Sequence, residues 1–172
     1  MLTEQNEVDL LFQSQEPWLK KKWQAKSMIS GIALEDSNQE EVKNPSDTSD
    51  IVGSLLYANH SQLDHCLITA QNAFNLNSHD PDRILESLNR AAELYEQNQF
   101  ELMALAMREA GKTYQDAIDE VREAVDFLRY YSNLARRVLP NKRKAMGVFV
   151  CISPWNFPLA IFTGQVAAAL AA

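Results

Sequence analysis

The sequence predicts an α/β parent fold, of which these 172 residues supply a mainly α-helical part, a small β-hairpin and the first strand of a doubly wound sheet. Three observations support this prediction. Apolar residues recur at helical spacing in several segments. Two short β-type runs flank the turn Asn44–Asp47. The apolar run Ala145–Ile152 enters a turn with two prolines, and the apolar segment Leu159–Ala172 follows, which is how such a sheet begins.

The first part of the chain reads as helix followed by a hairpin. Residues 1–28 have an amphipathic helical pattern, in which Pro17 separates off a second segment, Trp18–Met28. A polar stretch follows. Two strands are expected on either side of the turn, Glu41–Lys43 and Ile51–Tyr57.

Capping residues mark the next helices. Ser61 is a good N-cap for a helix that continues to Phe74. Pro81 follows Asp80, as helix starts favour, and the helical pattern that begins there ends at Gly111, which reads as a C′ residue.

This long pattern falters at Gln97–Gln99 before it resumes. Thr113 and Asp116 form a plausible capping box for one more helix, which is expected to run to about Arg137. Pro140 and the basic residues after it end that helix.

The final helix is apolar on all sides. From Ile161 to Ala172 the only polar side chains are Thr163 and Gln165. A helix of this kind must be covered on every side, and one strand with part of one helix cannot supply the cover. We therefore expect a piece of a larger domain, divided at residues 1–28, 29–144 and 145–172.

Composition narrows the functional classes. The formal charge of −7 argues against a nucleic-acid surface, and the Lys20–Lys22 run is interpreted as the solvated face of a short helix. Two isolated cysteines fit a reducing cytoplasm. No signal peptide is visible near Met1, and the last twelve residues are too few to span a bilayer.

Few residues have the pattern of a reactive site. Cys151 lies in an apolar run and reads as a packing residue, and Cys66 beside His65 is neither a metal spacing nor a dyad. No metal site and no Gly-rich nucleotide loop is expected. The acidic residues of one helix are interpreted by default as a solvated, salt-bridged surface: Asp116, Asp119, Glu120, Glu123 and Asp126.

Asn156 is the strongest candidate for chemistry. Its amide lies in the turn Pro154–Pro158, directly after the expected strand. The amide could hold the turn, or it could donate a hydrogen bond to an oxyanion that forms at the carboxyl end of the strand. The residues alone do not choose between these two roles.

Several stretches resemble one family. Cys151–Leu170 resembles the aldehyde dehydrogenase superfamily, and within it the L-glutamate γ-semialdehyde (Δ1-pyrroline-5-carboxylate) dehydrogenase modules of the bifunctional proline utilization A flavoenzymes. Further stretches agree in order and spacing: Asn44–Pro45, Asp50–Gly53, Arg108–Thr113 and Glu120–Tyr131. The resemblance implies a Rossmann-type NAD domain and oxidation of an aldehyde by NAD⁺ through a cysteine thiohemiacetal.

The resemblance also implies roles for particular residues. Asn156 would be the side-chain half of the oxyanion hole. Phe157 would line the aldehyde pocket, and Glu123 would face the substrate and orient its amino group. Four residues would lie along NAD: Ile152, Ser153, Pro154 and Trp155.

Other parts of the family's machinery are expected to lie outside these 172 residues. Neither Cys66 nor Cys151 matches the family's nucleophile, and its general-base glutamate lies downstream of the matched stretches. FAD is not expected to bind this segment. We therefore expect an inactive fragment whose partner is the remainder of the dehydrogenase, with a homo-oligomer possible. The alternative is a non-enzymatic helical module for interaction or regulation.

Overall fold

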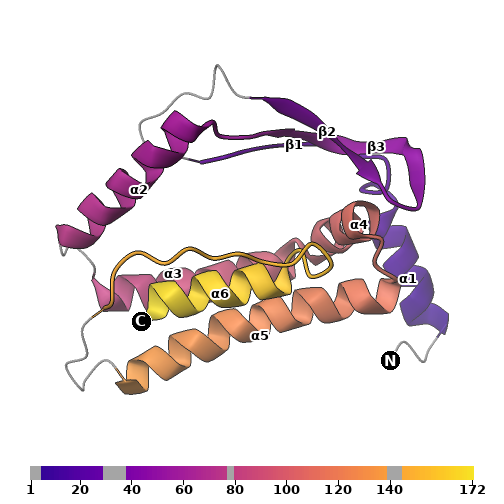
Figure 1. Ribbon diagram of the computed structural model, residues 1–172. Helices are drawn as coiled ribbons and strands as arrows, with labels where there is room; N and C mark the ends of the chain where they lie inside the picture. Colours follow the sequence, from indigo (N-terminus) through magenta and orange to yellow (C-terminus); the bar gives the residue numbers. More distant parts are fainter. Residues whose placement is uncertain (1–4, 29–37, 77–79, 139–144) are drawn as a thin grey trace.

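The computed structural model describes residues 5–28, 38–76, 80–138 and 145–172. Its elements are, in order, α1 (Gln5–Gln15), β1 (Trp23–Lys26), β2 (Gln39–Asn44), β3 (Asp47–Leu56), α2 (His60–Asn75), α3 (Pro81–Gln97), α4 (Gln99–Ala110), α5 (Tyr114–Val138) and α6 (Ala160–Ala171). Helices α3, α5 and α6 pack together, the sheet lies over α4, and α2 stands to one side (Figure 1). This confirms the expected mainly helical part with a small sheet.

The core between α3, α5 and α6 is made of small and medium apolar side chains. Its buried members are Leu85, Leu88, Ala92, Val125, Leu128, Ala135, Ala167 and Ala171. The closest approach is at Gly164 of α6, where a Cβ atom would come within 2.9 Å of the Phe127 ring on α5. Glycine therefore lets α6 lie directly against α5 at this point.

Local signals placed most helix boundaries correctly. The Asp80 carboxylate accepts from the Asp82 backbone N–H at 3.1 Å, and α3 begins with Pro81. Gly111 has φ +66°, the left-handed conformation expected of a C′ glycine. The backbone N–H of Asp116 donates to the Thr113 hydroxyl at 3.2 Å, which confirms that cap.

The cap of α2 was predicted at the wrong residue. Asn59, not Ser61, is the N-cap: its side chain accepts from the Gln62 backbone N–H at 2.9 Å. The Gln62 side chain in turn accepts from the Asn59 backbone N–H at 2.8 Å. An Asn with a Gln three residues later satisfies two donors at once, which a lone serine cannot do.

The sheet has the strand order β1-β3-β2. The β2–β3 hairpin turns at Asn44–Asp47, as predicted. However, the helical reading of Trp18–Met28 is wrong over Trp23–Lys26, because these residues form β1, parallel to β3. The Lys20–Lys22 run is exposed as expected, but it lies in the connection from α1 to β1 and not on a helix.

Gly53 permits the pairing of β1 with β3. It is the partner of Trp23 in the ladder, and a Cβ atom at this position would overlap the Trp23 carbonyl oxygen. We expect Gly53→Ala to lower the free energy of unfolding by about 1–3 kcal/mol, because a backbone cannot yield as a flexible side chain can. Thermal unfolding measures the loss, with Ser54→Ala as the control. Equal stability of the two variants would contradict this account of the close approach.

The strand expected at Ala145–Ile152 does not form in this chain. This segment runs alongside α3 and α6 without pairing to another strand (Figure 1). A strand requires a partner, and the described strands all lie in the sheet over α4. Pro140 and residues 141–144, expected to end α5, lie outside the described residues. Among the helices that the structure describes, none is long and apolar enough to cross a membrane.

Candidate functional site

The candidate site is built on a tight turn between the 145–152 segment and α6. The Phe157 backbone N–H donates to the Pro154 carbonyl at 3.3 Å, which leaves Trp155 and Asn156 at the tip. Proline favours such turns because its ring presets φ. The Trp155 side chain is 63% exposed and Phe157 is 38% exposed. The turn therefore presents its side chains outward.

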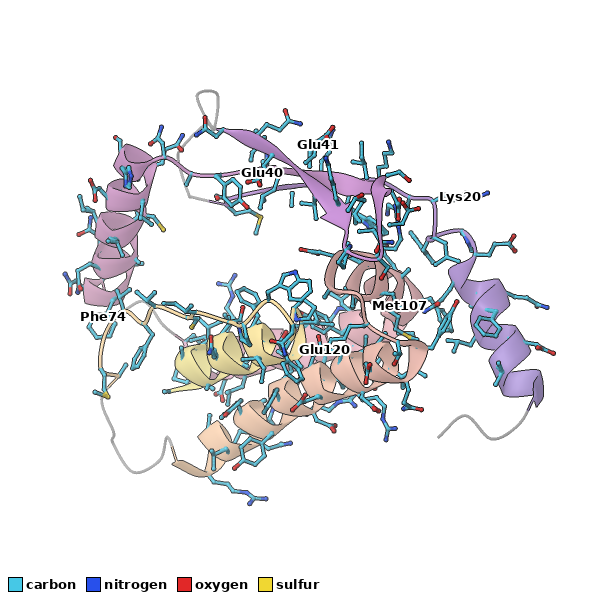
Figure 2. The ribbon with its side chains drawn as sticks, turned by 45° about the vertical axis from the view of Figure 1, so that its right-hand side comes forward. Lys20, Glu40, Glu41, Phe74, Met107 and Glu120 are labelled. Carbon is cyan, nitrogen blue, oxygen red and sulfur yellow. The ribbon has the colours of Figure 1, made fainter. Side chains whose placement is uncertain are left out.

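Two hydrogen bonds fix the ends of this turn. Before it, the Gln165 side chain on α6 donates its Nε2–H to the Ile152 carbonyl at 2.9 Å. After it, the Leu159 backbone N–H donates to Oε2 of Glu120 on α5 at 3.2 Å. Glu120 is only 2% exposed (labelled in Figure 2, near the start of α6). The turn is thus anchored to α6 and to α5.

A third contact comes from the end of α4. The Lys112 ammonium lies 4.2 Å from the centroid of the Phe157 ring, within cation–π range. Lys112 directly follows Gly111, whose left-handed backbone redirects the chain as α4 ends. The turn at Gly111, the C′ residue of α4, therefore places the Lys112 ammonium against the Phe157 ring.

The Asn156 amide is available for a ligand. Within the described residues its side chain makes no hydrogen bond, and the turn is closed by backbone atoms instead. Asn156 is exposed. This geometry therefore does not support a role of the Asn156 side chain in holding the turn. The amide NH₂ is free to donate to an oxygen that develops negative charge.

The other predicted site residues lie close along the chain or on α5. Ile152 is 79% exposed, Pro154 is exposed, and Ser153 is half-buried. Glu123 is exposed on α5, one helical turn after Glu120 and one before Phe127, both of which contact the α6 region. In the part of the chain that the structure describes, no hydrogen bond or ion pair joins Glu123 to the turn.

The surface interpretation of Glu120 is wrong. Sequence reasoning grouped it with exposed carboxylates, but α6 covers it and its carboxylate meets the start of that helix. Gln165 was also missed as a site-supporting residue. Its signal was present in the sequence, since an amide in an otherwise apolar helix needs a hydrogen-bond partner, which here is the Ile152 carbonyl.

A second polar cluster, centred on Arg108, holds the sheet to α4. Its guanidinium binds the Asp50 carboxylate with two hydrogen bonds, at 3.0 Å and 2.6 Å, and also donates to the Lys21 carbonyl. Arg108 is 5% exposed and lies 5.3 Å from the Trp23 ring centroid. This guanidinium holds the pKa of Asp50 below its usual value. Arg108 thus joins α4 to β3 and to the residues before β1.

The neighbouring residues of the Arg108–Thr113 stretch meet the hairpin. A Cβ atom on Gly111 would lie 3.3 Å from the Pro45 ring. Burial raises the pKa of Glu109, the residue after Arg108. Three stretches that sequence analysis singled out separately, at Asn44–Pro45, Asp50–Gly53 and Arg108–Thr113, therefore meet in one place.

An apolar cavity of about 810 Å³ lies at the other end of α6, and none of the turn residues 154–158 lines it. It is bounded by α2, α3, the 145–151 segment and α6, and Cys151 is among its lining residues. All of the described side chains that line it are apolar apart from this thiol. The described lining therefore places no cationic or basic side chain beside the Cys151 thiol.

Comparison with known proteins shows that this sequence is similar to aldehyde dehydrogenases. The model of the aldehyde dehydrogenase family matches residues 33–172. Over 153 residues the chain is 47% identical to the bifunctional protein PutA of Klebsiella aerogenes, which covers 88% of this chain and 12% of the relative. It is 33% identical over 141 residues to 1-pyrroline-5-carboxylate dehydrogenase of Anoxybacillus flavithermus, covering 74% of this chain and 27% of the relative.

Solved structures share the fold. Proline utilization A (PutA) from Bdellovibrio bacteriovorus superposes with a TM-score of 0.82 at 24% identity, over 96% of this chain and 19% of that one. A 1-pyrroline-5-carboxylate dehydrogenase from Thermus with bound NAD gives a TM-score of 0.82 at 24% identity, over 99% and 36%. The chain thus spans about an eighth of the length of its PutA relatives and about a quarter of its dehydrogenase relatives.

Proposed function

The chain belongs to the aldehyde dehydrogenase family, and on that premise we propose that it forms the N-terminal part of an NAD-dependent dehydrogenase that oxidises L-glutamate γ-semialdehyde to L-glutamate in proline catabolism. The observation that carries this proposal is the exposed, unpaired Asn156 amide on a turn anchored at both ends. The similarity to PutA and to 1-pyrroline-5-carboxylate dehydrogenase supports the proposed substrate.

In this proposal the turn binds and orients the aldehyde. The Asn156 NH₂ donates to the aldehyde oxygen and gains strength as negative charge develops there. The exposed face of Phe157 forms one wall of the aldehyde pocket. The Glu123 carboxylate, which no described residue pairs, accepts from the substrate's ammonium group and so orients glutamate semialdehyde along α5.

The residues before Asn156 fit a dinucleotide. Ile152 and Trp155 present apolar surface outward, Pro154 holds the backbone between them, and Ser153 offers a hydroxyl that has no partner among the described residues. Such surfaces suit flat aromatic rings, and a hydroxyl suits a ribose or an amide. Bound there, NAD would supply the acceptor for the hydride that leaves the aldehyde. The chain's contribution is to hold the reacting atoms in line with Asn156.

We further propose that the 172-residue chain does not turn over by itself. The chemistry that the family resemblance implies needs a nucleophilic cysteine and a general base. Cys66 lies on α2, and Cys151 lines an apolar cavity. No residue of the described site therefore supplies a nucleophile at Asn156.

A chimera tests this proposal. The chain alone, mixed with NAD⁺ and glutamate semialdehyde, is expected to form no NADH above the buffer control. When its matched residues replace the corresponding 153 residues of Klebsiella aerogenes PutA, the chimera is expected to form NADH with glutamate semialdehyde. Thermal unfolding of the chimera beside the unaltered PutA is the folding control. A chimera that unfolds at the temperature of PutA but forms no NADH with the semialdehyde would contradict the proposal, as would turnover by the chain alone.

A further inference from the structure

The N-terminus of α6 has no cap of its own. Leu159 is the N-cap residue, its side chain is apolar, and no side-chain hydrogen bond caps this helix. The Leu159 carbonyl accepts the first hydrogen bond of the helix, from the Thr163 backbone N–H at 3.0 Å. The first N–H groups of a helix need acceptors, which a polar N-cap side chain normally supplies.

Glu120 supplies the acceptor from another helix. Its Oε2 takes the Leu159 backbone N–H at 3.2 Å, which is the bond that an N3 glutamate makes in a capping box. Here the glutamate comes from α5, so the cap also ties the two helices together. A carboxylate at this end of α6 is further favoured by the helix dipole.

The same carboxylate is poorly placed for stability alone. It is 2% exposed, and its other oxygen, Oε1, is buried with no hydrogen-bond partner among the described residues. Leaving a buried polar oxygen unpaired is costly. A neutral side chain of similar size would fill this space at less cost. The unpaired Oε1 therefore lowers the stability of the fold, whereas Oε2 binds the Leu159 N–H.

What Glu120 holds is the segment that carries Asn156. Leu159 is three residues after Asn156, and the intervening Phe157–Pro158 leaves little freedom because proline fixes φ. The opposite end of the turn is held by Gln165, which belongs to α6 itself. Glu120 is thus the link from the start of α6 to α5, the helix that also carries Glu123.

We propose that Glu120 is a positioning residue that caps α6 from outside and so sets the direction in which Asn156 presents its amide. This inference rests on the proposed function of Asn156. Glu120 touches neither substrate nor cofactor in this scheme. It acts by accepting a hydrogen bond from the Leu159 N–H. This bond fixes the position of Asn156 on the turn relative to Glu123 on α5.

Three variants separate positioning from packing. Glu120→Met keeps the volume and removes the acceptor, Glu120→Asp keeps the charge but shortens the reach, and Glu120→Gln keeps an acceptor at the same reach. Asp119→Asn is the matched control, because Asp119 is the exposed neighbouring carboxylate and, among the described residues, accepts hydrogen bonds only from Gln115.

The first measurement is hydrogen exchange of the Leu159 amide in the 172-residue chain, together with its thermal midpoint. Exchange is expected to be about tenfold faster or more in the Met and Asp variants, since the hydrogen bond that protects this amide is lost. In the Gln variant and in the Asp119→Asn control, the exchange rate of the Leu159 amide should stay near that of the parent. The thermal midpoint of Glu120→Met is expected to stay level or rise. Unchanged exchange at Leu159 in both Met and Asp variants overturns the proposal.

The second measurement is NADH formation by the PutA chimera. We expect kcat to fall about 10- to 100-fold in the Met and Asp variants, because misplacing a reacting group by about 1 Å has effects of this size. The KM for NAD⁺ should be unchanged, and the Gln variant should recover most of kcat. If Glu120→Met does not fold, the Asp variant decides on its own.

Loss of activity with Leu159 exchange unchanged would also overturn the positioning role. The two proposals can fail separately. If Asn156→Ala leaves kcat of the chimera unaltered while the Glu120 variants still expose the Leu159 amide, the tether stands and the proposed role of Asn156 is wrong.

Discussion

Replacing Arg108 with alanine is expected to lower the free energy of unfolding by about 3 kcal/mol, the lower end of the range for removing one partner of a buried ion pair. Arg108 is 5% exposed, and its bidentate partner Asp50 would be left without the guanidinium. The lower end applies because the Asp50 side chain is 30% exposed, so water compensates part of the loss. Denaturant unfolding of the 172-residue chain measures this change.

The controls separate the bidentate geometry from simple charge. Arg108→Lys should recover only part of the stability, because an ammonium cannot bind both carboxylate oxygens and the Lys21 carbonyl in one plane. Arg90→Ala removes the exposed Arg90–Glu93 pair and should change stability by no more than about 0.5 kcal/mol. If Arg108→Ala and Arg90→Ala prove equal, Arg108 does not join the sheet to α4 as described.

The loss should also depend on pH. The hydrogen bonds from Arg108 lower the pKa of Asp50 below its ordinary 3.8 in the folded chain. The pair's contribution is therefore complete above that ordinary pKa, and it is lost as the pH falls through the lower pKa of the folded state. The stability difference between the parent and Arg108→Ala should be full near neutral pH and shrink in acid.

Local interactions made much of the fold predictable from sequence. Asp80 with Pro81, Thr113 with Asp116, and Gly111 each act within one helical turn, so neighbouring residues suffice to place them. β1 was missed because its partner strand, β3, lies beyond β2 in sequence. The pattern around Trp23 contains no signal of that pairing.

The position of the candidate site could be predicted from the sequence, but the residues that anchor its turn, Glu120 and Gln165, were not predicted. The sequence placed Asn156 in a turn after an apolar run, and the structure shows that turn with its amide unpaired. Whether Glu120 is exposed depends on where α6 lies, and that depends on the close contact between Gly164 and Phe127. The strand pattern of Ala145–Ile152 was read correctly as apolar, but strand formation depends on a neighbour that the described sheet does not provide.

Asn156→Ala is expected to lower kcat of the PutA chimera about 100- to 1,000-fold, the effect of removing one oxyanion donor. The variant should fold as the parent does, because the turn is closed by the Phe157 N–H and the Pro154 carbonyl and not by the amide. The KM for NAD⁺ should change little, since the residues proposed to contact the cofactor precede Asn156. Steady-state NADH formation with glutamate semialdehyde measures both quantities.

Asn156→Asp sharpens the test, because the carboxylate has nearly the same shape but can only accept hydrogen bonds when ionised. If the amide acts as a donor to a developing oxyanion, Asp should be at least as damaging as Ala, since it adds repulsion to the loss of the donor. If the amide instead acts through shape or by accepting, Asp should retain more activity than Ala. Asn72→Ala, an exposed asparagine on α2, is the control and should leave kcat unchanged. A chimera in which the Asp variant is more active than the Ala variant would therefore exclude the donor role of Asn156.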